Sequence, residues 1–372
     1  MSLLFSPLRL GPLELANRIV IAPMCQYSAH DGCVSDWHHI HLGNLALSGA
    51  GLLLLEATAV ESRGRISHAD LGLWNDDQEA ALAAMLASIR RWSPMPLGIQ
   101  LAHAGRKAST HRPWEGKGAI PADDPRGWTT VSASALAFDA DHGVPQALDA
   151  GGIDALVGDF VQAAHRAVRA GLDVVEIHAA HGYLLHQFLS PLSNRREDGY
   201  GGSLENRMRL VLRVFDAVRA VLPERIALGV RISATDRVEG GWDLGQSIAL
   251  ARALDARGCH YIHVSSGGLD PRQEIDAVPG YQVPFAEAIR REVRMAVIAV
   301  GLITRPRQAE AVLAEGRADA VALARGMLYD PRWPWHAAAE LGATLSPAPQ
   351  YLRCEPASAR GLFAPEPAPG RR

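Results

Sequence analysis

Short apolar runs recur along the chain, and most of the stretches between them are amphipathic with helix signals. In residues 76–91, for example, Leu82, Met85, Leu86 and Ile89 fall on one helical face. Runs that are apolar throughout, rather than alternating, are typical of strands in a parallel sheet that is covered on both faces. Eight such runs are present: Ile19–Pro23, Leu52–Glu56, Leu97–Leu101, Leu172–Ile177, Ile226–Ile232, His260–Ser265, Ala296–Val300 and Asp319–Leu323.

Eight strand–helix units predict an α/β fold, and eight parallel strands close a (β/α)8 TIM barrel. An open doubly wound sheet is the alternative, but no G-x-G-x-x-G segment follows the first strand. We expect one barrel domain over residues 1–372, with an N-terminal hairpin in Leu3–Asn17 that plugs the barrel bottom. The stretch 106–151 is too long for an ordinary connection and predicts a capping insertion after strand 3. The Pro/Ala-rich C-terminal tail, 346–372, is expected to leave the barrel surface.

Capping residues predict several helix boundaries. Helices are expected over Ser203–Leu222 and Gln246–Arg257, where apolar residues recur at helical spacing. Thr304 is expected to cap a further helix with Pro306 in its first turn, because threonine is a favoured cap and proline is tolerated there.

Composition narrows the possible partners and the compartment. The net charge of −3 and the pI of about 6.6 predict neither a nucleic acid nor an anionic membrane as a partner. No run of about 18 apolar residues predicts a membrane span, and the first ten residues lack a signal-peptide pattern. The four cysteines show no C-x-x-C pairing, which indicates a reducing, cytoplasmic location without disulfides or an iron–sulfur cluster.

The strongest candidate for chemistry is the segment that follows the fourth apolar run. His178, His181 and Tyr183 lie where that strand ends, at the rim on which barrel enzymes act. Two imidazoles can stabilise one developing oxyanion, and a neighbouring phenol can donate a proton. Two alternatives remain. One is zinc coordination with His186 as a third ligand, although no glutamate has the His-Glu-x-x-His spacing; the other is ordinary hydrogen bonding at a strand end.

Other strand ends suggest a planar cofactor with a phosphate tail. Loops after the last two strands of a barrel commonly bind phosphate, and Arg325 would add positive charge there. Gln100 could bind the pyrimidine edge of a flavin, and Arg231 could lie where negative charge accumulates on reduction, so FMN fits. Alternatively, Arg231 could pair with Glu56 or Asp236, and Arg325 could be a surface residue.

Several segments together resemble the Old Yellow Enzyme family of FMN-dependent ene reductases. They are APMCQY at 22–27, QLAHAGRK at 100–107, HAAHGYL at 178–184, FLSP at 188–191, NRR at 194–196 and YGGSLENR at 200–207. The resemblance extends from Asn17 to Tyr351. Cys25 and Tyr27 resemble the thermophilic-like subclass, since other branches have threonine in place of this cysteine.

The resemblance implies a non-covalent FMN over the barrel mouth and NADPH or NADH as reductant. His178 and His181 would bind the substrate's carbonyl oxygen, Tyr183 would protonate its α-carbon, and Tyr27 would line the substrate pocket. Cys25 would tune the flavin rather than act as a nucleophile. The residues expected to hold FMN are Ala22, Pro23, Met24, Cys25, Ala57, Gln100, Arg231, Gly301, Ala324 and Arg325.

The implied activity is reduction of the activated C=C bond of α,β-unsaturated carbonyl compounds, imides or nitroalkenes, with hydride delivered from flavin N5. The subclass also implies a homodimer or homotetramer, in which Arg353 of the tail at the subunit interface would reach the neighbouring subunit's site. Two other functions stay open: a metal-dependent TIM-barrel hydrolase, whose activity EDTA would abolish, and a non-catalytic ligand-binding barrel, which would not oxidise NADPH with an enone.

Overall fold

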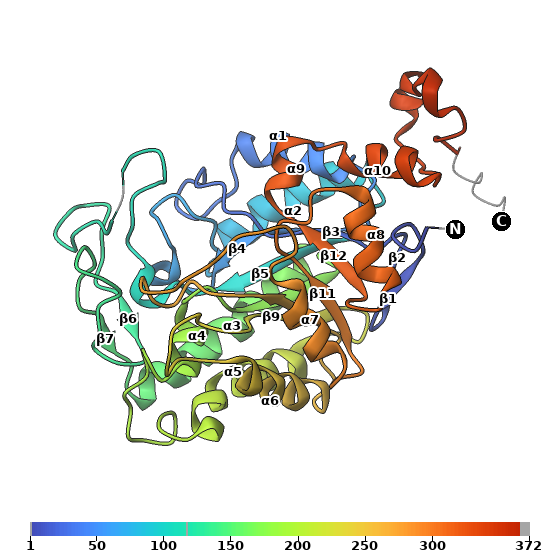
Figure 1. The fold of residues 1–372 in the computed structure, drawn as a ribbon. Helices are drawn as coiled ribbons and strands as arrows, with labels where there is room; N and C mark the ends of the chain where they lie inside the picture. Colours follow the sequence, from blue (N-terminus) through green and yellow to red (C-terminus); the bar gives the residue numbers. More distant parts are fainter. Residues whose placement is uncertain (1, 117, 365–372) are drawn as a thin grey trace.

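The computed structural model describes residues 2–116 and 118–364, and within them eight parallel strands close into a barrel (Figure 1). The prediction of a (β/α)8 barrel is therefore confirmed, and each apolar run corresponds to one strand. In their order around the barrel the strands are β3 (Ile19–Ile21), β4 (Leu52–Ala59), β5 (Leu97–Ala102), β8 (Val174–Ala179), β9 (Ala227–Ser233), β10 (Tyr261–Ser265), β11 (Ala296–Ala299) and β12 (Ala320–Leu323).

Helices surround the barrel and bury their apolar faces on the outward side chains of the strands. The longest, α3, places Ile153, Leu156 and Phe160 on one buried face. The helices are α1 (Asp36–Ala46), α2 (Asp76–Arg90), α3 (Ala150–Arg169), α4 (Leu184–Leu189), α5 (Leu204–Val221), α6 (Leu244–Asp255), α7 (Val283–Arg290), α8 (Pro306–Ala314), α9 (Arg325–Tyr329) and α10 (Trp333–Leu341).

One predicted helix cap is wrong, and some boundaries move. Thr304 does not cap α8: its N–H bonds Gln308 Oε1, and Arg305 occupies the N-cap position in an extended conformation. The cause is Pro306, because a residue that precedes proline is disfavoured in the helical region. Helix α6 begins before the predicted Gln246, since Asp243 accepts the Gln246 N–H and caps it.

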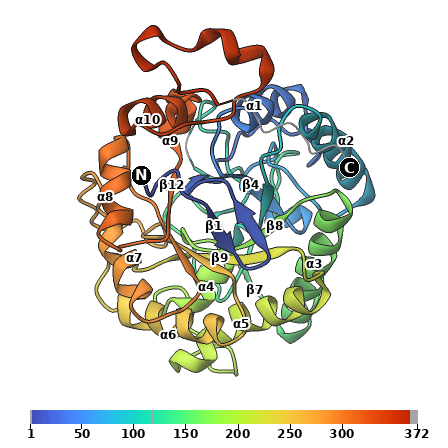
Figure 2. The ribbon, with the colours of Figure 1, turned by 90° about the vertical axis from the view of Figure 1, so that its right-hand side faces the viewer.

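The N-terminal hairpin closes the bottom of the barrel, as predicted. Strands β1 (Leu8–Leu10) and β2 (Leu13–Leu15) pair antiparallel and lie across that end of the barrel (Figure 2). Leu10 and Leu15 are fully buried in one cluster with the inward side chains at the amino ends of the strands, among them Tyr261.

The insertion and the tail lie at opposite ends of the molecule (Figure 1). The insertion follows β5 through a turn, η2 (Gly105–Lys107). It contains β6 (Val131–Ser132) and β7 (Gln146–Ala147), and Trp114 packs edge-on against Tyr27, 6.0 Å between ring centroids. The described part of the tail forms η3 (Pro349–Cys354) and η4 (Ala357–Ala359) beside α10; residues 365–372 of the predicted tail lie outside the described residues.

Candidate active site

Most of the expected site residues lie at the carboxyl ends of barrel strands, which form the mouth opposite the hairpin. The pairing of β8 with β9 puts His178 beside Arg231, and the pairing of β4 with β5 puts Ala57 beside Gln100. Arg353 is the exception: it is exposed in η3, on the tail that projects away from the insertion. The residues at or just beyond these strand ends are Ala22, Pro23, Met24, Cys25, Tyr27, Ala57, Gln100, His178, His181, Tyr183, Arg231, Gly301, Ala324 and Arg325.

The two histidines form a directed hydrogen-bond chain. The Ala180 N–H donates to His178 Nδ1 at 3.2 Å, so the proton of a neutral His178 is on Nε2, which lies 3.4 Å from His181 Nδ1. His181 Nε2 lies 2.7 Å from Ser265 Oγ, and that hydroxyl donates to Gln282 Oε1 at 3.0 Å. The His178 Nε2–H is therefore directed at His181 Nδ1, the proton of a neutral His181 is on Nε2 and is directed at Ser265 Oγ, and Ser265 orients this second ring.

The backbone that carries His181 is held by several contacts. His181 has a positive φ of 58°, and its N–H donates to Ser233 Oγ at 2.9 Å. Lys107 Nζ donates to the His181 carbonyl at 2.9 Å and to the Gly268 carbonyl at 2.6 Å. A Cβ on Gly182 would lie 2.1 Å from that Gly268 carbonyl, which only glycine avoids. These contacts fix the loop between the two histidines and Tyr183.

Burial keeps these groups neutral at neutral pH. It lowers the pKa of His178 and of His181 well below the usual value, and the Arg231 cation lowers both further. Burial raises the pKa of Tyr183 well above its usual value, and its ring packs edge-on against His178, with 5.1 Å between ring centroids. The site thus combines neutral N–H donors with a protonated phenol.

Polar groups also line the inside of the barrel below the histidines. Gln100 Nε2 donates to Glu176 Oε1 at 2.7 Å, and Glu176 Oε2 lies 3.1 Å from His263 Nδ1. Arg231 forms no ion pair with Glu56 or Asp236, which pair instead with histidines. Its buried Nε has no partner among the described residues. Such an unpaired donor is unfavourable unless a ligand accepts from it.

The chain's residues fit FMN. Arg231 offers a buried cation with an unused donor, and Gln100 offers an amide, as a flavin ring requires. The loops after β11 and β12 lie at the same end of the barrel, because these strands pair. Gly301 there has a φ of 122°, which L side chains rarely adopt, and Arg325 is exposed at the start of α9. A planar ring over Arg231 with a phosphate near Arg325 matches this donor set.

Asp70 is a further buried carboxyl near the mouth, and the sequence did not indicate it. Asp70 is about 1% exposed and accepts from Ser67 Oγ at 2.7 Å and from the Ile66 N–H at 2.9 Å. Burial and the neighbouring Glu56 carboxylate raise its pKa to about 7. Burial also raises the pKa of the Cys25 thiol well above its usual value, so this thiol is protonated at neutral pH.

The zinc alternative finds no support from His186. The Gly182 N–H donates to His186 Nδ1 at 2.9 Å, and His186 Nε2 lies 2.8 Å from the buried Asp236 Oδ1. Within residues 2–116 and 118–364, no group of three or more His, Cys, Asp or Glu side chains is arranged to hold a metal ion.

No helix in the same ranges is long and apolar enough to cross a membrane.

Comparisons with known proteins identify relatives of this chain. The chain matches the NADH:flavin oxidoreductase / NADH oxidase family over residues 3–343. It is 46% identical to an NADPH dehydrogenase of Listeria innocua over 355 residues, which cover 95% of this chain and 99% of that protein. It is similar to the structure of morphinone reductase, with a TM-score of 0.76, 33% identity and coverage of 94% and 92%. An old yellow enzyme homologue from Zymomonas mobilis gives a TM-score of 0.75, 27% identity and coverage of 92% and 94%.

Proposed function

Because the chain belongs to the NADH:flavin oxidoreductase / NADH oxidase family, that is, the Old Yellow Enzyme family, we propose that it reduces activated C=C bonds. The protein is an FMN-dependent NADPH oxidoreductase. The substrate class we propose is α,β-unsaturated carbonyl compounds, imides and nitroalkenes. The observation that carries this proposal is the neutral His178–His181 pair beside a protonated Tyr183.

The residues that would hold FMN include Arg231, whose buried Nε lacks a partner among the described residues, and others whose amide, charge or backbone conformation suits a flat ring with a phosphate tail. Arg231 and Gln100 would bind the polar edge, and Gly301 with Arg325 would bind the phosphate. With FMN bound at these residues, the chemistry supplied would be transfer of hydride from NAD(P)H to the β-carbon of the second substrate. Because both substrates would use the same mouth in turn, ping-pong kinetics are expected.

His178 and His181 would bind the substrate's electron-withdrawing oxygen. With the Ser265 hydroxyl turned to donate to His181 Nε2, the proton of neutral His181 would be on Nδ1, and this Nδ1–H and the His178 Nε2–H could both donate to an oxygen that becomes negative as hydride arrives, without being consumed as acids. Ser265 and Lys107 would keep His181 in place during this step, since they bond its ring and its carbonyl. Tyr183 would then donate its phenolic proton to the α-carbon, and Tyr27, packed under Trp114, would line the pocket.

Titration of the FMN-loaded protein with a phenol tests the oxygen-binding pair directly, because a phenolate resembles the enolate. We expect a long-wavelength charge-transfer band in the wild type. His181→Ala should weaken binding strongly, since removal of one such donor is worth roughly 2.7–4 kcal/mol in a transition state. His336→Ala, a largely exposed histidine on α10, is a matched control and should leave the titration unchanged. Equal phenol affinity in all three proteins would contradict the assignment.

We also propose that the chain forms a homodimer or homotetramer in which Arg353 reaches the mouth of a neighbouring subunit. An arginine in a tail exchanged about a two-fold axis suits an interface near a flavin, because its guanidinium is a fixed charge with a rigid set of donors. Sedimentation velocity of a chain that ends at Gln350, compared with the full chain, tests this.

A further inference from the structure

A basic cavity of about 390 Å³ lies beside the mouth. It is formed by the loop after β3, the loop after β4 and the capping insertion, and its volume falls in the range of roughly 300–1,000 Å³ that small-molecule sites occupy. Three arginines line it, Arg63, Arg65 and Arg126, together with His68 and the half-exposed Trp128. None of these residues belongs to the FMN or substrate sites described above.

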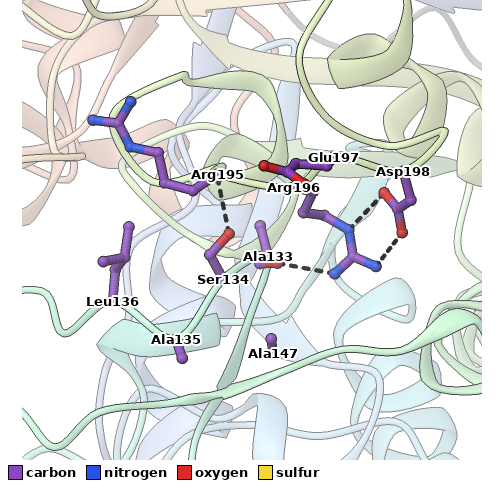
Figure 3. A pocket seen from close by; sticks show the side chains of 9 residues that line it. All are labelled: Ala133, Ser134, Ala135, Leu136, Ala147, Arg195, Arg196, Glu197 and Asp198. Atoms are coloured by element: carbon purple, nitrogen blue, oxygen red, sulfur yellow. Dashed lines mark hydrogen bonds and ion pairs between the residues drawn. The ribbon is translucent and has the colours of Figure 1, made fainter.

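The charges that line this cavity are unbalanced. Asp31 is the one carboxylate among its lining residues; Arg63 pairs with Glu61 and Arg126 with Asp124, two carboxylates that lie just outside the lining. A larger surface groove of about 420 Å³ shows the contrast: Arg195 and Arg196 there are balanced by Glu197 and Asp198, and Arg196 binds Asp198 and the Ala133 carbonyl (Figure 3). Of these two cavities, the basic one therefore has more arginines than carboxylates among its lining residues, and Arg65 is the arginine among them without an ion-pair partner in the described residues.

Arg65 is the best-placed cation in the cavity. Its guanidinium lies 5.3 Å from the ring centroid of Trp74 and 5.0 Å from that of Trp128. Nε donates to the Ser62 carbonyl and Nη1 to the His68 carbonyl, and no carboxylate of the described residues pairs with it. The group is thus pre-oriented by aromatic and backbone contacts, with Asp70 and Asp31 near enough to act on its charge but no carboxylate of the described residues at ion-pair distance.

The basic cavity adjoins the active site. A smaller cavity is lined by Tyr183, Ala57 and Asp70, and Arg65 lines both this cavity and the basic one. Arg65 therefore lies at the boundary between the mouth and the basic cavity, where a ligand that occupies both would pass it.

We propose that the basic cavity binds the phosphate-bearing adenosine half of NADPH while its nicotinamide lies at the mouth. The inference rests on the NADPH oxidation described above, and it names the residues that would distinguish NADPH from NADH. Arg65 would bind the pyrophosphate at the junction of the cavities, and Arg63 and Arg126 would bind the 2′-phosphate, since guanidinium groups match phosphate geometry. Trp128 offers an aromatic face on which adenine can stack, as bases do on aromatic side chains.

Nucleotide binding to the FMN-loaded protein tests the site. Isothermal titration with NADP⁺ and NAD⁺ is measured for the wild type, Arg63→Gln and Arg126→Gln, whose side chains are about half exposed and whose replacement should not disturb folding. We expect each substitution to lower the ratio of NADP⁺ to NAD⁺ affinity roughly tenfold, the lower end for loss of a hydrogen bond to a charged group. Arg294→Gln, 92% exposed near β11, is the matched control and should keep the wild-type ratio.

A fragment provides a second measurement. Adenosine 2′,5′-bisphosphate, which has no nicotinamide, should compete with NADPH in the wild type and compete more weakly in Arg126→Gln. An unchanged NADP⁺-to-NAD⁺ ratio in both cavity variants, with flavin still reduced by NADPH, would overturn the site assignment alone. A wild-type flavin that neither NADPH nor NADH reduces would instead overturn the proposed function.

Discussion

The two ends of this barrel are built from the same strands but differ in what they bury. Inward-facing residues alternate along each strand, and near the hairpin they are apolar: Val174 on β8, Ala227 on β9 and Tyr261 on β10. Two steps further along β8 the inward residue is Glu176, followed by His178 at the mouth. One face of a single strand thus passes from core packing to a polar site.

Backbone strain follows the same division. All six non-glycine residues with positive φ in the described ranges lie in loops that leave the carboxyl ends of strands: Tyr27, Asp31, Ser109, His181, Arg237 and Leu302. Such conformations are unfavourable for L side chains and persist where surrounding contacts enforce them, commonly at functional sites. Apolar packing at the bottom of the barrel therefore stabilises the fold. This stabilisation offsets the cost of the neutral polar groups and strained loops at the mouth. Four substitutions separate these roles.

Tyr183→Phe should have the largest effect, and at the mouth alone. Loss of a positioned acid typically slows proton transfer by roughly 10²–10⁴-fold, so reoxidation of the reduced flavin by an enone should slow while reduction by NADPH is retained. Anaerobic stopped-flow absorbance measures both half-reactions separately. Equal slowing of the two half-reactions would contradict the proton-donor role.

Leu15→Ala should act on stability rather than on chemistry. Leu15 is fully buried in the bottom cluster, and removing such a side chain costs about 2–5 kcal/mol of unfolding free energy. Urea unfolding should show this loss, and both half-reaction rates should be unchanged well below the unfolding transition. Leu13→Ala, partly buried on the same hairpin, is the control with a smaller expected loss. A slower half-reaction in Leu15→Ala would mean that the two ends are coupled.

Asp70→Asn should raise the free energy of unfolding at high pH, because ionisation of the buried Asp70 carboxyl destabilises the folded state there. Because the pKa of Asp70 is raised from 3.8 to about 7 on folding, the folded state holds this proton more tightly than the unfolded state. Its contribution is present below pH 3.8 and is lost as pH rises through about 7. The variant, which cannot ionise there, should therefore gain stability relative to the wild type as pH rises from about 4 to about 7, by up to a few kcal/mol, with no further gain above that range. A stability difference independent of pH would refute the shift.

Cys25→Ser should have the smallest effect. The thiol is protonated at neutral pH and is a weak donor, so its replacement should shift the flavin reduction potential and change either half-reaction by less than about tenfold. Spectroelectrochemistry with FMN bound measures the potential. Complete inactivation of a flavin-loaded variant would show that Cys25 does more than tune the flavin.

The same division explains what could be predicted from the sequence. Burial determines the strands, so eight apolar runs predicted the barrel, and the resemblance of motifs such as HAAHGYL located the mouth residues. The contacts around His181 were not predictable. Ser265, which contacts the His181 ring, lies 84 positions from His181 in the sequence. Lys107 donates to the carbonyls of both His181 and Gly268, and Gly268 lies 161 positions from this lysine. Such pairs depend on how the loops fold over the mouth, which no local pattern records.

The remaining misses have similar causes. Asp70 does not directly follow an apolar run in the sequence. The loop after β4 nevertheless brings its carboxyl back to the site, where it accepts a hydrogen bond from Ser67. Thr304 was misassigned as a cap because the effect of Pro306 on the preceding residue outweighed threonine's preference for that position.

The measurement that tests the central claim most directly is a single-turnover experiment on the purified protein without added metal. The protein should be yellow with bound FMN, and NADPH should bleach it in the absence of oxygen. Subsequent mixing with 2-cyclohexen-1-one should restore the flavin absorbance, with EDTA present throughout. A protein that binds no FMN, or a reduced flavin that stays bleached with enones, imides and nitroalkenes alike, would contradict the assignment of the barrel mouth as an ene-reductase site.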